Sequence, residues 1–82
     1  LKGAIFMVSY FKNQRDLANA LIVLIDNYWN HELDEEILIK LVNEISKKNH
    51  DKLFKNGNYT SMVNQRLGKR RVELLNKLIE VL

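Results

Sequence analysis

Apolar residues recur at helical spacing in three stretches of the chain, and the first of these carries the widest apolar face. In residues 13–30, Asn13 is a candidate N-cap, with Asp16 three positions later in an arrangement like a capping box. A face this wide favours packing against two neighbours, so we expect this helix at the centre of the core, with Tyr28 and Trp29 as a lid rather than a ligand platform. Its apolar residues are Leu17, Ala18, Leu21, Ile22, Leu24, Ile25, Tyr28 and Trp29.

The second stretch predicts a helix over residues 34–49. Asp34 is a candidate N-cap, and Leu33 and Leu38 fit a hydrophobic staple across it. Acidic residues begin this stretch and lysines end it, as the helix dipole favours. The expected buried face consists of Ile37, Leu38, Leu41, Val42 and Ile45, with Ile39 pointing elsewhere.

The third stretch is the longest helical pattern and predicts one helix over about 60–81, capped by Thr60 or Ser61. From Val72 onward it has an apolar stripe, whereas before Val72 the same side carries Asn64, Gly68 and Arg71. This helix therefore has an anchoring end and a basic end. The stripe and its flanks comprise Val72, Leu74, Leu75, Leu78, Ile79, Val81 and Leu82.

Residues 50–59 connect the last two helices, and Asn56-Gly57 is a strong turn signal within them. The turn could close a small hairpin, or Gly57 could end a one-turn helix in a left-handed cap. We favour the one-turn helix because the flanking runs are too short for independent strands. Leu53, Phe54 and Tyr59 are expected to pack on the bundle. The predicted fold is a compact all-α bundle of three main helices in one domain, residues 1–82.

Residues 1–11 are apolar and aromatic without a helical period, which is compatible with a short strand. Met7 is an alternative start of the natural protein, and residues 1–6 would then lie upstream of it.

Composition limits the functional classes. The chain has 46% hydrophobic and 28% charged residues and no cysteine, which excludes a disulfide scaffold, a thiolate metal site and a cysteine nucleophile. The lack of cysteine suits a cytoplasmic protein. No apolar run reaches the roughly 20 residues of a membrane-spanning helix, so we expect no membrane partner.

No pattern of catalytic or metal-binding residues is present in the sequence. Ser9, Ser46, Thr60 and Ser61 have no His and Asp at a catalytic spacing, and no phosphate-binding glycine motif occurs. His31 stands beside acidic residues that a solvated helix start explains better than a metal site does. We therefore expect no enzyme, no metal and no cofactor.

Charge is unevenly distributed along the chain, whose net charge is +3. Residues 1–50 hold six Lys or Arg and seven Asp or Glu, whereas residues 51–82 hold seven and three. Such asymmetry favours a polyanionic partner, although a solvated helix face is the plain alternative.

The basic end of the third helix carries the leading functional hypothesis. Gln65, Arg66, Lys69 and Arg70 lie within six residues, and Arg66, Lys69 and Arg70 fall opposite the later apolar stripe. Arg and Lys neutralise phosphate, and Arg or Gln can read base edges, so this segment predicts a small DNA- or RNA-binding or regulatory protein. Glu73 could reduce the positive charge of this segment by pairing with Lys69, Arg70 or Lys77.

The alternative hypothesis is a protein-interaction module or homodimer that docks through Asn64, Gly68 and Arg71. Gly68 costs about 1 kcal/mol relative to Ala within a helix, which close approach of another backbone or a phosphate would explain. The plain alternative is that the glycine is simply tolerated. Arg71 also has a structural alternative, in which it pairs with an acid such as Asp26 or Glu44. The order of helices is roughly that of a helix-turn-helix, but the connector is longer than the usual three or four residues.

Three segments resemble a family of short bacterial proteins that occurs mainly in Gram-positive bacteria and has no established function. They are FKNQRDLANAL at 11–21, NYW at 27–29 and KNGNYTSMVNQRLGKRRVELL at 55–75, and the likeness covers most of residues 10–80. The resemblance implies a small cytoplasmic protein that begins at Met7, and it supplies no activity or site.

Overall fold

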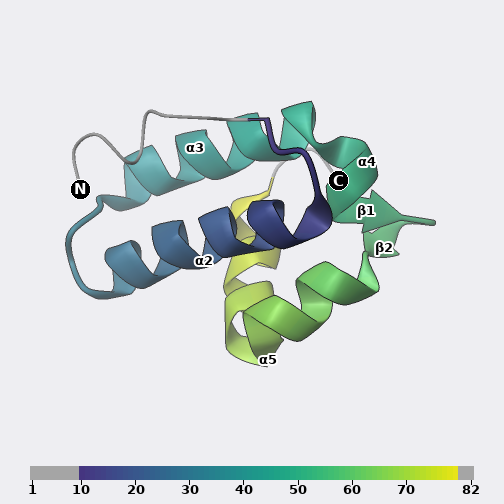
Figure 1. Cartoon of the computed structure of the whole chain (residues 1–82). Helices are drawn as coiled ribbons and strands as arrows, with labels where there is room; N and C mark the ends of the chain where they lie inside the picture. The colour runs from purple at the N-terminus through teal and green to yellow at the C-terminus, as the bar shows by residue number, and fades with distance from the viewer. Residues whose placement is uncertain (1–9, 80–82) are drawn as a thin grey trace.

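A computed structural model describes residues 10–79, in which three main helices surround one core (Figure 1). Helix α2 (Gln14–Trp29) lies between α3 (Glu35–Lys48) and α5 (Ser61–Leu78). The one-turn helix α4 (His50–Leu53) and a hairpin of β1 (Phe54–Lys55) and β2 (Asn58–Tyr59) connect α3 to α5. The predicted bundle of three main helices is thus confirmed. The alternative start at Met7, and all but the last two residues of the suggested strand, lie outside the described residues.

Helix α2 forms the centre of the core, as its wide apolar face predicts. The Asn13 side-chain oxygen accepts a hydrogen bond of 2.8 Å from the backbone N–H of Asp16, which caps the first turn. Leu17, Leu21 and Ile25 are fully buried.

Helix α3 is rotated relative to the prediction. Leu38, Val42 and Ile45 are buried, but Ile37 is 43% exposed and Ile39 is partly buried against the core, so the assignment of these two isoleucines was wrong. The line of Leu38, Val42 and Ile45 at spacings of four and three faces the core, and Ile37 lies about 100° away from Leu38. Asp34 occupies the N-cap position without a side-chain capping bond.

The connector contains both structures that the sequence left open. The one-turn helix α4 is present, but the Asn56-Gly57 turn closes a hairpin, so the preference against a hairpin was wrong. Asn56 and Gly57 both have positive φ, at 55° and 83°, as tight hairpin turns require. Phe54 stacks on Tyr59 at 5.3 Å between ring centroids, and Phe54 is buried. This packing compensates for strands of only two residues each.

Helix α5 is broken at Gly68, which corrects the prediction of one uninterrupted helix. Gly68 has φ 81° and ψ 167°, so the segments before and after it are separate helices that meet at a kink. The kink also changes the buried face, because Val63 and Leu67 are buried before it and Leu75, Leu78 and Ile79 after it.

Candidate functional site

Helix α5 crosses one edge of α2, and contacts along this edge position Arg66, Arg70 and Arg71. On a helical wheel at about 100° per residue, Arg15, Asn19, Asp26 and Trp29 fall within a band of roughly 80° on α2. Cations of α5 contact three of these four residues. We call this edge the α2–α5 seam.

Arg71 stabilises the kink by contacting both α2 and the helical segment before Gly68. Its Nε and Nη2 donate to the two carboxylate oxygens of Asp26 at 3.0 and 3.1 Å, and its Nη1 donates to the carbonyl oxygen of Leu67 at 2.9 Å. Leu67 ends the helical segment before Gly68, where carbonyls lack partners within the helix. The predicted pairing of Arg71 with Asp26 is confirmed, and the charge of Arg71 is neutralised by this partly buried ion pair.

Arg66 and Arg70 lie at two other points of the seam and remain exposed. Arg66 donates from Nε and Nη2 to the side-chain oxygen of Asn19 at 3.3 and 3.0 Å. The Arg70 guanidinium lies 5.2 Å from the centre of the Trp29 ring, within the range of a cation–π contact. Neither contact neutralises charge, so both guanidinium groups are held in place with their charge available.

Gln65 and Lys69 complete the predicted basic segment, and both are exposed. The expected pairing of Glu73 with Lys69, Arg70 or Lys77 is not formed within residues 10–79. The kink separates Gln65 and Arg66 from Lys69 and Arg70, so the four residues belong to two helical segments rather than to one continuous face.

The alternative docking residues are also separated by the kink. Asn64 is exposed on the first segment, Gly68 is half-buried at the kink, and Arg71 is held by Asp26 on the second. A Cβ built on Gly68 would meet no described atom within 4 Å, so no other backbone approaches it closely. The positive φ explains the glycine instead, since this backbone region is essentially restricted to glycine.

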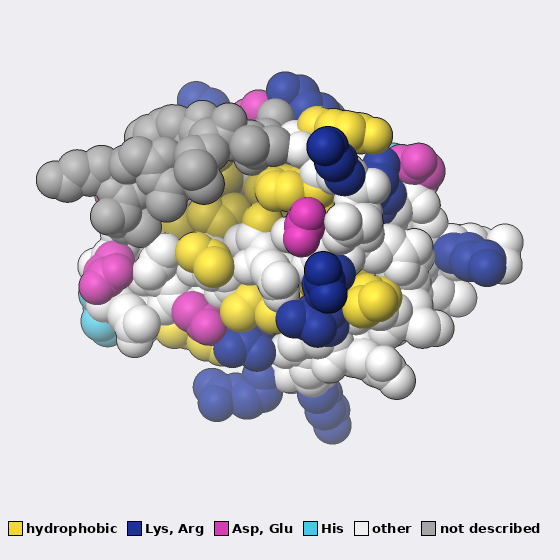
Figure 2. All heavy atoms as spheres, in the orientation of Figure 1, with side chains coloured by type: hydrophobic (Ala, Val, Ile, Leu, Met, Phe, Trp, Pro, Cys, Tyr) yellow, Lys and Arg dark blue, Asp and Glu magenta, His cyan; other side chains and the backbone are white. Residues whose placement is uncertain are grey.

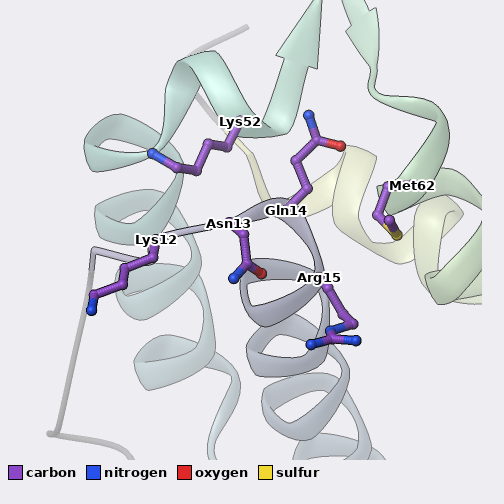
Figure 3. A pocket seen from close by; sticks show the side chains of 6 residues that line it. All are labelled: Lys12, Asn13, Gln14, Arg15, Lys52 and Met62. Atoms are coloured by element: carbon purple, nitrogen blue, oxygen red, sulfur yellow. The ribbon is translucent and has the colours of Figure 1, made fainter.

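A second basic group, at the start of α2, was missed in the sequence. Lys12 and Arg15 line an open groove of about 530 Å³ together with Lys52 of α4 and Met62 of α5. In Figure 3, Lys12 and Lys52 lie to one side of Asn13, and Arg15 and Met62 lie to the other. Lys52 is far from Lys12 and Arg15 in the sequence. Counting charges along one segment could therefore have suggested Lys12 and Arg15, but not their proximity to Lys52.

The groove and the α2–α5 seam meet at Arg15, which belongs to both. Arg15 and Asn19 are one helical turn apart on α2, and Met62 and Arg66 are one turn apart on α5. Figure 2 shows Lys and Arg side chains at several places over the lower part of the molecule, with exposed apolar side chains near some of them. We call Lys12, Arg15, Lys52, Arg66 and Arg70, together with the exposed Lys69 that precedes Arg70 in the chain, the basic seam.

Two ionisable groups have shifted pKa values. A hydrogen bond between the Lys52 ammonium and the Tyr10 hydroxyl, 3.0 Å long, raises the pKa of Lys52, which keeps its charge at neutral pH. Burial raises the pKa of Tyr59 to about 12. The Tyr59 hydroxyl donates to the Asn76 side-chain oxygen at 2.7 Å, so this phenol ties the hairpin to α5 rather than acting in proton transfer.

The described part of the chain contains no group of three or more His, Asp or Glu placed to hold a metal ion. Among residues 10–79, no helix combines the length and apolar character that crossing a membrane requires.

Comparison with known proteins places the chain beside one family. The model of a family described as a conserved hypothetical protein matches residues 9–80. Neither a curated protein nor a solved structure matches the chain significantly.

Proposed function

The chain belongs to this family of conserved hypothetical proteins, and because the family's description names no activity, we propose from its surface that it binds nucleic acid through phosphate contacts. The proposed role is that of a small binding or regulatory protein of the cytoplasm, without catalytic activity. Arg66, Lys69 and Arg70 contact phosphates, and Gln65 contributes a polar contact beside them.

One observation carries the proposal. The basic seam comprises six cations, which come from α2, from the residue before its N-cap, from α4 and from α5, and none of the six forms an ion pair within residues 10–79. Arg71, which lies beside them, is neutralised by Asp26 and is excluded from the set. Because phosphate contacts release condensed counterions, unneutralised cations on one surface favour a polyanion such as DNA or RNA.

Acidic residues near the seam reduce this field, among them Asp51, which interacts electrostatically with Lys52. Asp16 is exposed next to Arg15, and its carboxylate accepts a hydrogen bond from the Asn13 amide at 3.4 Å. Asp26 already has its guanidinium partner. The remaining positive charge lies at the groove and around the kink, which is where we place the phosphates.

The test is the salt dependence of binding. We expect the wild-type protein to bind labelled DNA or RNA at low salt, with a slope of log K against log salt of about −0.7 to −0.9 per phosphate contact. Arg66→Ala together with Arg70→Ala should flatten the slope by about two contacts with little change in melting temperature, because exposed positions contribute little stability.

The matched control removes the same charge from another face. Lys40 and Lys47 are exposed on α3, on the other side of α2 from α5, so changing both to Ala should leave the slope near that of the wild type. If no DNA or RNA binds in low-salt titrations, the proposal is wrong. Light scattering after size exclusion would then test the alternative, docking of a protein partner or a second copy at Asn64 and Gly68.

A further inference from the structure

We infer that the nucleic acid is a single strand, which runs from the groove at the start of α2 along the α2–α5 seam to Trp29. This inference rests on the proposed function and specifies its substrate class. It is carried by exposed apolar and aromatic side chains that accompany the cations, and by the shape of α5.

Three of the five exposed large hydrophobic side chains among the described residues lie on this path. Tyr10 is 56% exposed, Met62 is 39% exposed and Trp29 is 37% exposed. Single-strand binding surfaces combine a basic track for the backbone with aromatic groups on which bases stack. A surface that contacts only the outer backbone of a duplex has no need of exposed rings.

Two of these side chains contact a cation of the basic seam, and the third lines the same groove as one. The Lys52 ammonium is 4.4 Å from the centre of the Tyr10 ring, and the Arg70 guanidinium is 5.2 Å from the centre of the Trp29 ring. Met62 lines the groove with Arg15. A nucleotide at each point could therefore place its phosphate on the cation and its base on the apolar group or on the guanidinium plane.

The geometry of α5 disfavours insertion into a duplex. Reading the major groove requires a protruding helix or a two-stranded ribbon. Gly68 ends the first segment of α5 after Leu67, and both segments bury residues in the core. The basic residues are instead distributed over the start of α2, α4 and both segments of α5, which forms a track rather than a projection.

The length of the track suits several nucleotides. Arg15 and Trp29 are fourteen residues apart on α2, roughly 21 Å at about 1.5 Å per residue. The groove extends the path beyond Arg15 to Lys12 and Lys52, on the far side of Asn13 (Figure 3). A probe of about 12 nucleotides lies within the range of known single-strand site sizes and would cover this path.

Trp29 is the only tryptophan in the chain, so its fluorescence reports directly on one end of the path. We would titrate the protein with a 12-nucleotide oligothymidine, with oligouridine of the same length, with a 12-base-pair duplex and with inorganic polyphosphate. We expect a single strand to bind about tenfold more tightly than the duplex and to quench Trp29. Polyphosphate should bind without the quenching that a stacked base causes.

Variants at the aromatic residues separate stacking from charge. Tyr10→Leu and Trp29→Leu should each weaken single-strand binding by at least about fivefold, measured by anisotropy of a labelled oligonucleotide, and leave the salt slope unchanged. Trp29→Phe should retain most of the affinity, because it keeps a ring at that position. Ile37→Gln changes an exposed apolar residue on α3 and serves as the control with no expected effect.

The outcomes distinguish this inference from the proposed function. If the duplex binds as tightly as the single strand, or if both Leu variants bind like the wild type, the single-strand inference is wrong while phosphate binding stands. If no probe binds at low salt, both are wrong. Melting temperatures of the Leu variants within a few degrees of the wild type would show that lost binding is not lost folding.

Discussion

At the residue scale, Gly68 and Arg71 act together to determine the path of α5. Gly68 supplies a backbone conformation that other residues adopt only at a cost, and Arg71 satisfies the Leu67 carbonyl at the end of the segment before it. The same guanidinium binds Asp26 of α2 through two bonds. Gly68 permits the kink, and Arg71 fixes its position against α2.

Gly68→Ala is expected to destabilise the protein by about 1–3 kcal/mol, because φ of 81° and ψ of 167° are strained for alanine. In an ordinary helix the same change would stabilise by about 0.5–1 kcal/mol. Urea denaturation measures the difference. Asn64→Ala, at an exposed helical position of the same element, is the control and should be neutral or slightly stabilising. A Gly68→Ala variant more stable than the wild type would contradict the kink.

Arg71→Ala should lower stability by about 1–2 kcal/mol, because it removes the ion pair with Asp26 and leaves the Leu67 carbonyl without this donor. Arg71→Lys should retain only part of the stability that Arg71→Ala loses, since an ammonium cannot reproduce the bidentate contact with Asp26. Arg70→Ala is the matched control and should cost less than about 0.5 kcal/mol. A double-mutant cycle with Asp26→Asn measures the coupling, and a value near zero would show that the pair contributes nothing.

At the element scale, α2 is the part of the fold on which the others are assembled. It contacts α3 and α4 on one side and α5 on the other, and it presents the polar edge that forms the seam. The hairpin has a smaller role, because it turns the chain so that α5 begins against the start of α2. Thr60 supports this turn, since its backbone N–H donates to the Leu53 carbonyl at 3.0 Å.

Leu21→Ala should destabilise the protein by roughly 2–5 kcal/mol, because Leu21 is fully buried at the middle of α2 and its loss leaves a cavity. Val23 is two residues away on the same helix but 51% exposed, so Val23→Ala should change stability by less than about 0.5 kcal/mol. Thermal denaturation of the two variants compares them directly. Equal melting temperatures would remove α2 from the centre of the core.

At the scale of the whole molecule, the fold assembles a basic surface that charge along the chain only partly indicates. The first 50 residues carry a net negative charge, yet Lys12 and Arg15 of that half lie beside Lys52 of the other half. Of the acids of the first half, Glu35 and Glu36 lie at the start of α3, whereas Asp26 lies at the seam and is neutralised by Arg71. The charge variants at Arg66 and Arg70 on α5 and the ring variants at Tyr10 and Trp29 together test this surface, because they remove contacts from three separate segments.

The helices and their central member could be predicted from the sequence, because periodicity and capping are local signals. The spacing of Leu17, Leu21 and Ile25 and the cap at Asn13 lie within one element, where neighbouring residues decide the outcome. The pairing of Arg71 with Asp26 was also within reach, since a cation on an apolar face requires a partner. Its candidate partners were few.

The hairpin, the kink and the seam were decided by tertiary structure. Strands of two residues are too short to form alone, and the packing of Phe54 and Tyr59 stabilises them here. A glycine in a helical pattern does not reveal its backbone angles, so continuity through Gly68 was the default expectation. At the seam, Arg66 contacts Asn19, which is 47 residues away in the sequence. Periodicity within a single helix does not reveal which face of that helix meets which face of another.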